Sequence, residues 1–253
     1  MSGNPTLALA NDLAGIEGLA TAGLAARTAA DTWATRSVAV TASTGLSVSN
    51  GDGVAGNPTL AGLAASETVI GVAELATQTE TNDGTDDARI VTPLKLVTRP
   101  GTIRQIVSTQ TGAVATGATV LPVDDTIPTQ SGPVEGNEYM TLAITPRATT
   151  NKLRIDVTIN LSSDAAPMGI SAALFQDTTA NALAVVFGHV SAVSAGVILT
   201  FSHVMDAGTT SSTTFKVRAG PQTAATLTFN GAAGGRYFGG VFASSIRITE
   251  YVP

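Results

Sequence analysis

Hydrophobic and polar residues alternate most clearly between residues 151 and 161. Odd-numbered positions from Leu153 to Leu161 hold leucine, isoleucine or valine, and even-numbered positions from Lys152 to Asn160 are charged or polar. A two-residue period places the two sets on opposite faces of a strand, and a single apolar face is typical of an antiparallel sheet that covers a core. The alternation therefore predicts a half-buried strand with Ile155 facing inward.

Similar short runs follow one another after residue 101. They occupy residues 104–109, 139–145, 151–161, 169–176, 182–190, 196–205, 213–219, 225–229 and 238–251. About eight or nine strands without a convincing helix predict an antiparallel β-sandwich, and this strand count fits a jelly roll. His189 and His203 share the phase of apolar neighbours in their runs, so we expect both to be buried.

The first hundred residues are repetitive. Residues 3–8, GNPTLA, recur at 56–61, and alternating segments lie between the two copies. One Asn-Gly pair and one Asp-Gly pair, at residues 50–53, favour a hairpin between residues 46–49 and 54–60. Residues 11–20 fit a short helix or a loop. Because such repeats bury little alone, we expect them to pack against identical segments of neighbouring chains. A chain that starts within a repeat is expected to be a fragment or the end of a longer fibre.

Composition excludes several classes of protein. The chain has 253 residues with 43% hydrophobic, 13% charged and 4% aromatic residues, and no cysteine. Disulfides and thiolate metal sites are therefore impossible. The net charge of -6 leaves no basic face for phosphates, so we expect no nucleic-acid binding. No apolar run approaches the roughly 20 residues that span a bilayer, so we expect no membrane insertion.

Searches for catalytic motifs are negative. Gly-x-Ser-x-Gly, His-Glu-x-x-His, a phosphate loop and a cysteine nucleophile are all absent. Two pairs of carboxylates could serve a glycosidase: Asp124 with Asp125, and Glu135 with Glu138. Adjacent residues of an extended chain point to opposite faces, which makes joint action of the first pair harder. We therefore expect no enzymatic activity.

We also expect no cofactor and no metal. The acidic run at 83–87 lacks the ladder of ligands that calcium needs, and capping of the next helix by Asp86 or Asp87 is the favoured reading. Trp33, the single tryptophan, suits either a contact between chains or a platform for sugar. A glycine-rich stretch at 231–240 lacks the strand-to-helix setting that cradles phosphate, so it predicts a bending loop.

A motif at 76–96, ATQTETNDGTDDARIVTPLKL, separates the two halves of the chain. With its lead-in at 65–75 it resembles a repeat of bacteriophage tail fibres. The matching residues are Ala76, Glu80, Gly84, Thr85, Asp86, Val91, Thr92, Pro93 and Leu96. Within it we predict a strand at 68–75, a helical turn at 76–82 and a short element at 92–97.

The resemblance implies three regions: a repetitive shaft or attachment region at 1–65, a collar at 66–100 and a receptor-binding head at 101–253. The head, with its apolar closing strand at 237–248, looks like the trimeric jelly-roll heads of the tumour necrosis factor and complement-type class. The expected protein is a homotrimeric tail fibre of the virion. Its N-terminal region would join other tail or baseplate proteins, and its head would bind a glycan or protein of the bacterial surface.

Two alternatives stay open, a polysaccharide depolymerase tailspike and a purely structural fibre or assembly component. If the head binds a receptor, loops at its distal end are expected to carry the site. The candidate residues are Arg236, Tyr237, Asp177, Asn181 and Asp206. Arg236 and Tyr237 combine a hydrogen-bonding fork with a flat ring, which suits sugars or anionic groups. The other reading packs Tyr237 between subunits and leaves Arg236 in solvent.

Overall fold

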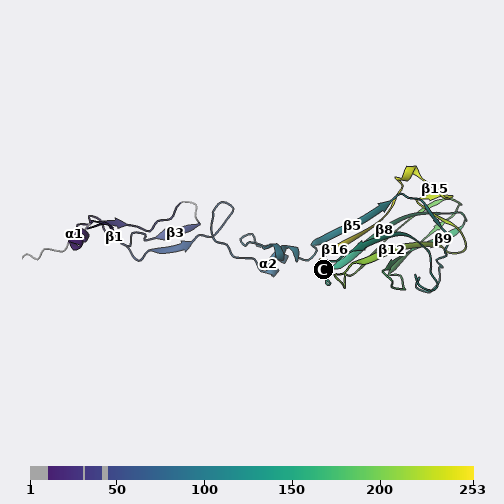
Figure 1. Ribbon diagram of the computed structural model, residues 1–253, viewed down its shortest axis with the longest axis horizontal. Helices are drawn as coiled ribbons and strands as arrows, with labels where there is room; N and C mark the ends of the chain where they lie inside the picture. The colour runs from purple at the N-terminus through teal and green to yellow at the C-terminus, as the bar shows by residue number, and fades with distance from the viewer. Residues whose placement is uncertain (1–10, 31, 42–44) are drawn as a thin grey trace, which may run out of the picture. The chain divides into compact units, whose positions relative to one another are not determined.

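The computed structural model describes residues 11–30, 32–41 and 45–253. The chain divides into two compact units, Met1–Leu96 and Val97–Pro253, and strands predominate in the second (Figure 1). The predicted repeat copy at residues 3–8 lies outside the described residues.

The N-terminal unit contains two small hairpins. A short helix, α1 (Asn11–Glu17), precedes the hairpin of β1 (Leu24–Ala29) with β2 (Thr32–Arg36), in which Trp33 lies opposite Arg27. The second hairpin joins β3 (Leu46–Ser49) to β4 (Thr59–Gly62). This confirms the predicted hairpin, although its second strand starts at Thr59.

The motif at residues 76–96 folds around a helix with defined ends. Helix α2 (Gln78–Asp83) starts with a capping box, in which the Thr77 hydroxyl accepts from the Glu80 N–H and the Glu80 carboxylate accepts from the Thr77 N–H at 2.8 Å. Gly84 ends the helix at φ 64°, a conformation that favours glycine. Pro93 occupies the first position of α3 (Pro93–Val97), where a proline needs no N–H partner. The predicted helical turn and short element are thus confirmed.

Arg89 links the parts of this motif. Its guanidinium pairs with Glu74 at 3.3 Å, with Glu80 at 3.0 Å and also with Asp86. Asp86 accepts the Ala88 N–H at 2.8 Å, so it closes its own turn. The prediction that Asp86 or Asp87 caps the next helix was wrong, because Arg89 and this turn occupy the Asp86 carboxylate well before α3 begins.

The strand predicted at 68–75 is also wrong. The segment forms only isolated bridges, of Val72 with Ala64 and of Leu75 with Ile90. The Val72 N–H donates to the Leu63 carbonyl at 2.7 Å across a bend, and Gly71 approaches the backbone of Leu63 too closely for a side chain. The bend turns the chain back before a ladder can extend.

The C-terminal unit is an antiparallel sandwich of eight long strands. They are β5 (Ile103–Thr111), β7 (Asn137–Ile144), β8 (Lys152–Ser163), β9 (Met168–Gln176), β10 (Ala184–Val190), β11 (Gly196–Asp206), β12 (Thr213–Pro221) and β16 (Ser244–Tyr251). One sheet has the order β10-β9-β12-β7, and the other has β5-β16-β8-β11. Numbered one to eight along the chain, the strands form sheets 1-8-3-6 and 2-7-4-5, which is jelly-roll topology and confirms the predicted fold.

Short elements extend the larger sheet at one end of the sandwich. There β13 (Leu227–Phe229) pairs with the last residues of β8 and with β6 (Ala115–Gly117). A hairpin of β14 (Gly231–Ala232) with β15 (Gly235–Arg236) and a 3-10 turn, η1 (Phe238–Gly240), precede β16. The segment predicted as one strand at 238–251 therefore begins as a turn and becomes a strand at Ser244.

The core lies between the two sheets. All five apolar residues of β8 from Leu153 to Leu161 are buried, as are Ile246 and Ile248 of β16 and Phe215 of β12. The inward direction predicted for Ile155 is confirmed.

The structure corrects the prediction for the histidines. His189 is exposed on the outer face of β10 together with Val185 and Phe187, while His203 is half-buried on the inner face of β11. In β10, Ala184, Val186 and Val190 face the core in the same phase as Gly188. A side chain at Gly188 would meet Leu199 Cδ2 at 2.5 Å, so the inner face has no room for a large residue there.

Candidate functional site

The chain between β13 and β16 forms a loop that rests on a buried polar network. The Asn230 amide donates to the carbonyl oxygens of Thr111 at 2.8 Å and Ala113 at 3.0 Å, and its oxygen accepts from the Ser244 hydroxyl at 2.7 Å. Ser244 in turn accepts the Asn160 N–H at 2.9 Å. Asn230, Ser244 and Asn160 are buried. Buried polar groups with all partners in place hold a single arrangement, so this network fixes the base of the loop.

Aromatic side chains project from this base. Tyr237, Phe238 and Phe242 form a cluster with ring centroids 6.0 to 6.3 Å apart. Phe238 is 76% exposed and Val241 is 84% exposed. We call residues 236–242 the aromatic tip. Figure 1 shows the β14–β15 hairpin and the C-terminus at opposite ends of the sandwich, so the tip lies away from the end where the chain enters at residue 101.

The backbone of the tip adopts an unusual conformation. Phe238 has φ 48°, and Gly239 and Gly240 have φ 64° and 100°. Positive φ is rare for a bulky residue and costs roughly 1 to 3 kcal/mol. The strained backbone holds the large Phe238 ring in solvent, where the ring gains little free energy from burial. A side chain at Gly240 would meet Arg236 Nη1 at 3.4 Å, so the arginine lies along this bare backbone.

The remaining candidates predicted from sequence do not join Arg236 and Tyr237. Asp177 accepts from the Thr213 hydroxyl and the Thr214 N–H, both at 2.7 Å, which ties the β9–β10 loop to the start of β12. Asp206 pairs with Lys152 at 2.7 Å. Asp177 bonds to Thr213, which lies opposite Ile144, and Asp206 lies opposite Lys152. Both aspartates therefore sit at the end where the chain enters the sandwich.

Asn181 lies at this entry end too, where it forms a bridge with Thr129. The five candidates therefore fall into two groups at opposite ends of the head. Phe238, Val241 and Phe242 escaped the sequence-based prediction because a continuing strand was expected there. Their apolar side chains directly beside Gly239 and Gly240 were the available signal.

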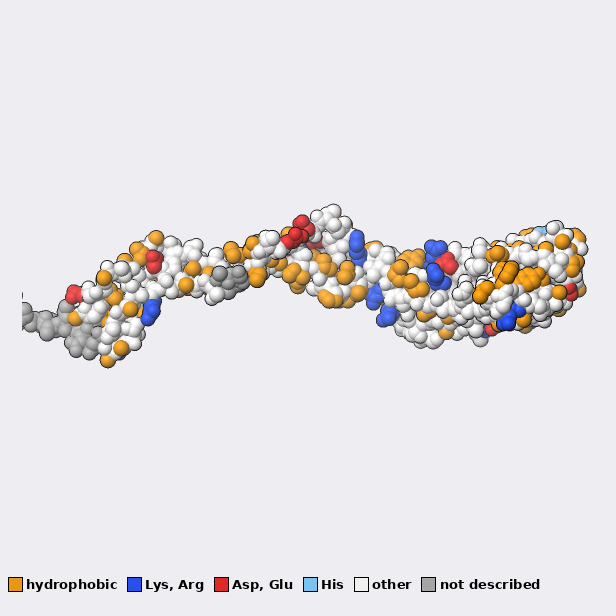
Figure 2. Space-filling view, turned by 90° about the horizontal axis from the view of Figure 1, so that it is seen from above, with side chains coloured by type: hydrophobic (Ala, Val, Ile, Leu, Met, Phe, Trp, Pro, Cys, Tyr) orange, Lys and Arg blue, Asp and Glu red, His pale blue; other side chains and the backbone are white. Residues whose placement is uncertain are grey.

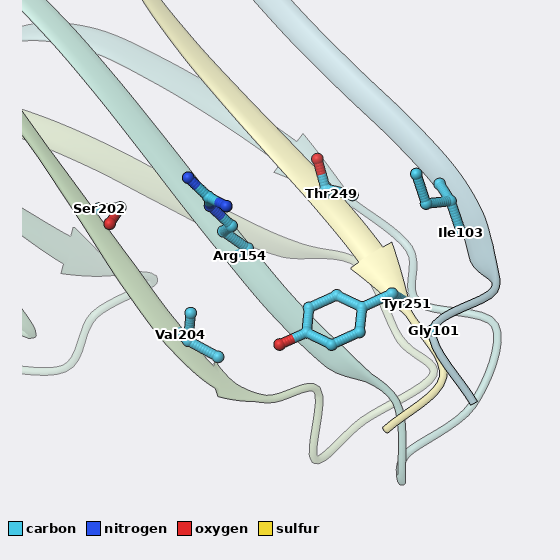
Figure 3. A pocket seen from close by; sticks show the side chains of 7 residues that line it. All are labelled: Gly101, Ile103, Arg154, Ser202, Val204, Thr249 and Tyr251. Carbon is cyan, nitrogen blue, oxygen red and sulfur yellow. The ribbon is translucent and has the colours of Figure 1, made fainter.

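A shallow hollow lies on the outer face of the larger sheet. It has a volume of about 500 Å³ and is lined by Gly101, Ile103, Arg154, Ser202, Val204, Thr249 and Tyr251. Figure 3 shows the Tyr251 ring reaching from the end of β16 across β8 toward Val204 of β11. Arg154 donates to Asp156 at 2.9 Å, so its charge is already paired. This face is a broad open surface more than an enclosed site.

The carboxylates considered for hydrolysis have other partners. Glu135 accepts the Thr129 N–H at 2.6 Å, and Glu138 pairs with Arg218 at 3.6 Å. Asp124 accepts the hydroxyl and the N–H of Thr126 at 2.6 and 2.9 Å, and these hydrogen bonds hold the pKa of Asp124 below its ordinary value. Among the described residues, no group of three or more histidines or acidic residues is placed to hold a metal ion. No helix in the described part of the chain is long and apolar enough to cross a membrane.

Comparisons with known proteins find similar structures only. No protein-family model matches the chain, and no curated protein matches its sequence. The Eiger TNF of S. frugiperda is similar over 58% of this chain and 93% of its own, with 10% identity and a TM-score of 0.34.

Two viral proteins are also similar. The VP2 subviral particle of infectious bursal disease virus matches 60% of this chain and 39% of its own, with 10% identity and a TM-score of 0.28. The enzymatically active domain of tailspike protein 4 from bacteriophage CBA120 matches 59% and 22%, with 12% identity and a TM-score of 0.22. This chain thus spans less than half of either viral chain. Because all three scores are below 0.5, the fold assignment rests on strand order.

Proposed function

We propose that this protein is the receptor-binding component of a phage tail fibre and attaches the virion to the bacterial surface. The aromatic tip is the observation that carries the proposal. Exposed rings on a rigid base make poor structural elements but good anchors, since aromatic residues and arginine dominate the energetics of binding surfaces. The tail-fibre motif supports the virion part of the proposal. The tip binds a glycan or protein without cleaving it, and the N-terminal unit joins other tail or baseplate proteins.

Self-association belongs to the same proposal. Within the described part of residues 1–96, Ala76 is the single buried hydrophobic residue. Fifteen larger apolar side chains between Leu13 and Leu96 are exposed among the described residues, and Figure 2 shows hydrophobic side chains along the surface of this unit. A unit without a core cannot offset the entropy of folding by itself. We therefore propose that identical chains cover these residues, as three copies in the tail-fibre arrangement.

The outer face of the larger sheet offers a second surface for this contact. Ile103, Ile106, Ile198 and Val204 are all exposed there. Light scattering on the full chain tests the assembly. We expect the mass of three 25.4 kDa chains at micromolar concentration, and a particle of 25.4 kDa would contradict the proposal.

Cell binding tests the tip. The fluorescently labelled full chain is screened against bacterial strains until one binds it, and the Phe238→Asn, Val241→Ser double variant is then compared with it. Asparagine tolerates positive φ, so the backbone of the tip is kept. We expect binding to fall at least ~10-fold, which corresponds to a loss of about 1.4 kcal/mol.

Val134→Ser is the matched control, because Val134 is an exposed valine outside the tip. Its binding should equal that of the original chain. Unchanged binding by a folded double variant would remove the tip from the receptor site. Shortened polysaccharide released by the unmodified chain would support the depolymerase instead, and an assembled chain that binds no strain would favour a structural fibre component.

A further inference from the structure

A second possible binding site lies on the outer face of the smaller sheet. The segment between β6 and β7 crosses this face and is pinned at both ends, by a Leu121 N–H to Pro221 carbonyl bond of 3.0 Å and an Ala182 N–H to Pro128 carbonyl bond of 2.9 Å. Gly220 permits the crossing, because a side chain there would lie 2.5 Å from the Thr119 oxygen. The segment stops short of β10 and leaves a cleft between itself and that strand.

The cleft has an apolar wall and a fixed ring. Its volume is about 190 Å³, and Pro122, Val123, Val185 and Phe187 line it. Phe187 is 51% exposed, and a side chain at Gly169 would lie 2.7 Å from its ring. Gly169 therefore gives the ring room to lie against the sheet. An aromatic ring held in this way presents one face to a ligand.

Polar groups also reach the cleft. Ser171 lies directly opposite Phe187 in the pairing of β9 with β10 and lines the cleft floor. Ser171 is only 2% exposed, and its hydroxyl is not among the fully buried side-chain atoms that lack a partner. The little of Ser171 that is accessible therefore opens into the cleft. A molecule held in the cleft can hydrogen-bond with this hydroxyl.

Asp124 supplies a second polar group at the rim. One of its carboxylate oxygens, Oδ1, accepts both hydrogen bonds from Thr126, which orients the group. The other oxygen, Oδ2, stays available to accept a hydrogen bond from a ligand. No lysine or arginine lines the cleft, so it does not suit phosphate, sulfate or an acidic sugar.

We propose that this cleft binds one uncharged pyranose ring of a surface glycan. The C–H face of a sugar packs on Phe187 and Val185, while sugar hydroxyls donate to the free oxygen of Asp124 and bond with the Ser171 hydroxyl. The volume of about 190 Å³ is several times the ~30 Å³ of a water molecule and below the ~300 Å³ of drug-sized pockets, so a single ring fits it. This inference deepens the proposed function, on which it rests for the source of the sugar.

Saturation-transfer NMR on the full chain tests the cleft directly. The probes are the methyl glycosides of glucose, galactose, mannose, rhamnose, N-acetylglucosamine and N-acetylgalactosamine, each at millimolar concentration. We expect at least one to bind, and we expect Phe187→Ala or Asp124→Asn to weaken it at least ~10-fold. Asp125→Asn is the matched control, because it removes a neighbouring carboxylate that does not line the cleft.

Ser171→Ala adds a readout that separates binding from folding. Removing a hydroxyl that opens into the cleft should leave the melting temperature nearly unchanged, while sugar binding falls. No binding of any probe, or binding that survives Phe187→Ala and Asp124→Asn, would overturn the inference and leave the tip and its cell binding intact. Sugar binding in the cleft by a chain that adsorbs to no cell would support the inference and count against the proposed function.

Discussion

Replacing Asn230 by aspartate tests whether the polar network holds the aromatic tip. The two residues have nearly the same shape, and both tolerate the φ of 56° found here. The change keeps the oxygen that accepts from Ser244. It replaces the amide that donates to the Thr111 and Ala113 carbonyls with an oxygen that repels them.

The expected loss of stability follows from these contacts. Two neutral hydrogen bonds contribute about 2 kcal/mol together. A carboxylate with the Ser244 hydroxyl as its one donor adds to this loss because Asn230 is fully buried. The head should therefore lose about 3 to 5 kcal/mol of unfolding free energy. Asn181→Asp makes the same chemical change at an exposed residue and should cost less than about 0.5 kcal/mol.

Denaturation of the full chain in urea, followed by circular dichroism, measures the change. Trp33 lies in the N-terminal unit, so its fluorescence reports that unit separately and should not shift. If Asn230→Asp and Asn181→Asp unfold at the same urea concentration, the network does not carry the loop as argued.

Two further predictions concern the core. The Glu250 carboxylate is buried, which by itself would raise its pKa, but hydrogen bonds from Asn151, the Arg147 N–H and Gln105 outweigh burial and lower it. The ionised Glu250 carboxylate therefore stabilises the fold above the unfolded-state pKa of about 4.3, and this stabilisation is lost as the pH falls through the lower folded-state pKa. A Glu250→Gln chain should melt at a lower temperature than the original chain at pH 7, and the difference between their melting temperatures should shrink in acid. A difference that stays constant with pH would contradict this reading. Ile155→Ala should cost the head about 2 to 4 kcal/mol through lost burial and a cavity, and an unchanged urea midpoint would show that this face is not core.

The contrast between β8 and β10 shows what the sequence could predict. In β8 one phase is apolar and the other polar, so alternation determines both the strand and its inner face. In β10 both phases are apolar, and size favours the wrong one, since Val185 and Phe187 are larger than Ala184 and Gly188. The inner phase is set by Leu199 of β11, which leaves no room beside Gly188. Only the packed sandwich contains that information.

The candidate site was predictable to a similar extent. Arg236 and Tyr237 stand out in the sequence because two ring- and charge-bearing residues follow a glycine run. Their separation from Asp177 and Asp206 depends on strand register, which places the intervening loops at opposite ends of the sandwich. The cleft was hidden for the same reason, since Asp124 and Phe187 lie 63 positions apart along the chain and meet only across a crossing segment.

The surfaces proposed for assembly and for binding lie on different sides of the head. The exposed apolar residues of the larger sheet face away from the core on one side, the cleft opens on the outer face of the smaller sheet, and the tip occupies the end away from residue 101. Copies that associate through the larger sheet would leave the tip and the cleft accessible on every chain. Several weak sugar contacts on one particle then act together, because after the first contact the others form at high effective concentration. A millimolar affinity for one ring is thus compatible with firm attachment of a trimer, and disruption of the assembly should weaken adsorption to cells far more than it weakens binding of a single methyl glycoside.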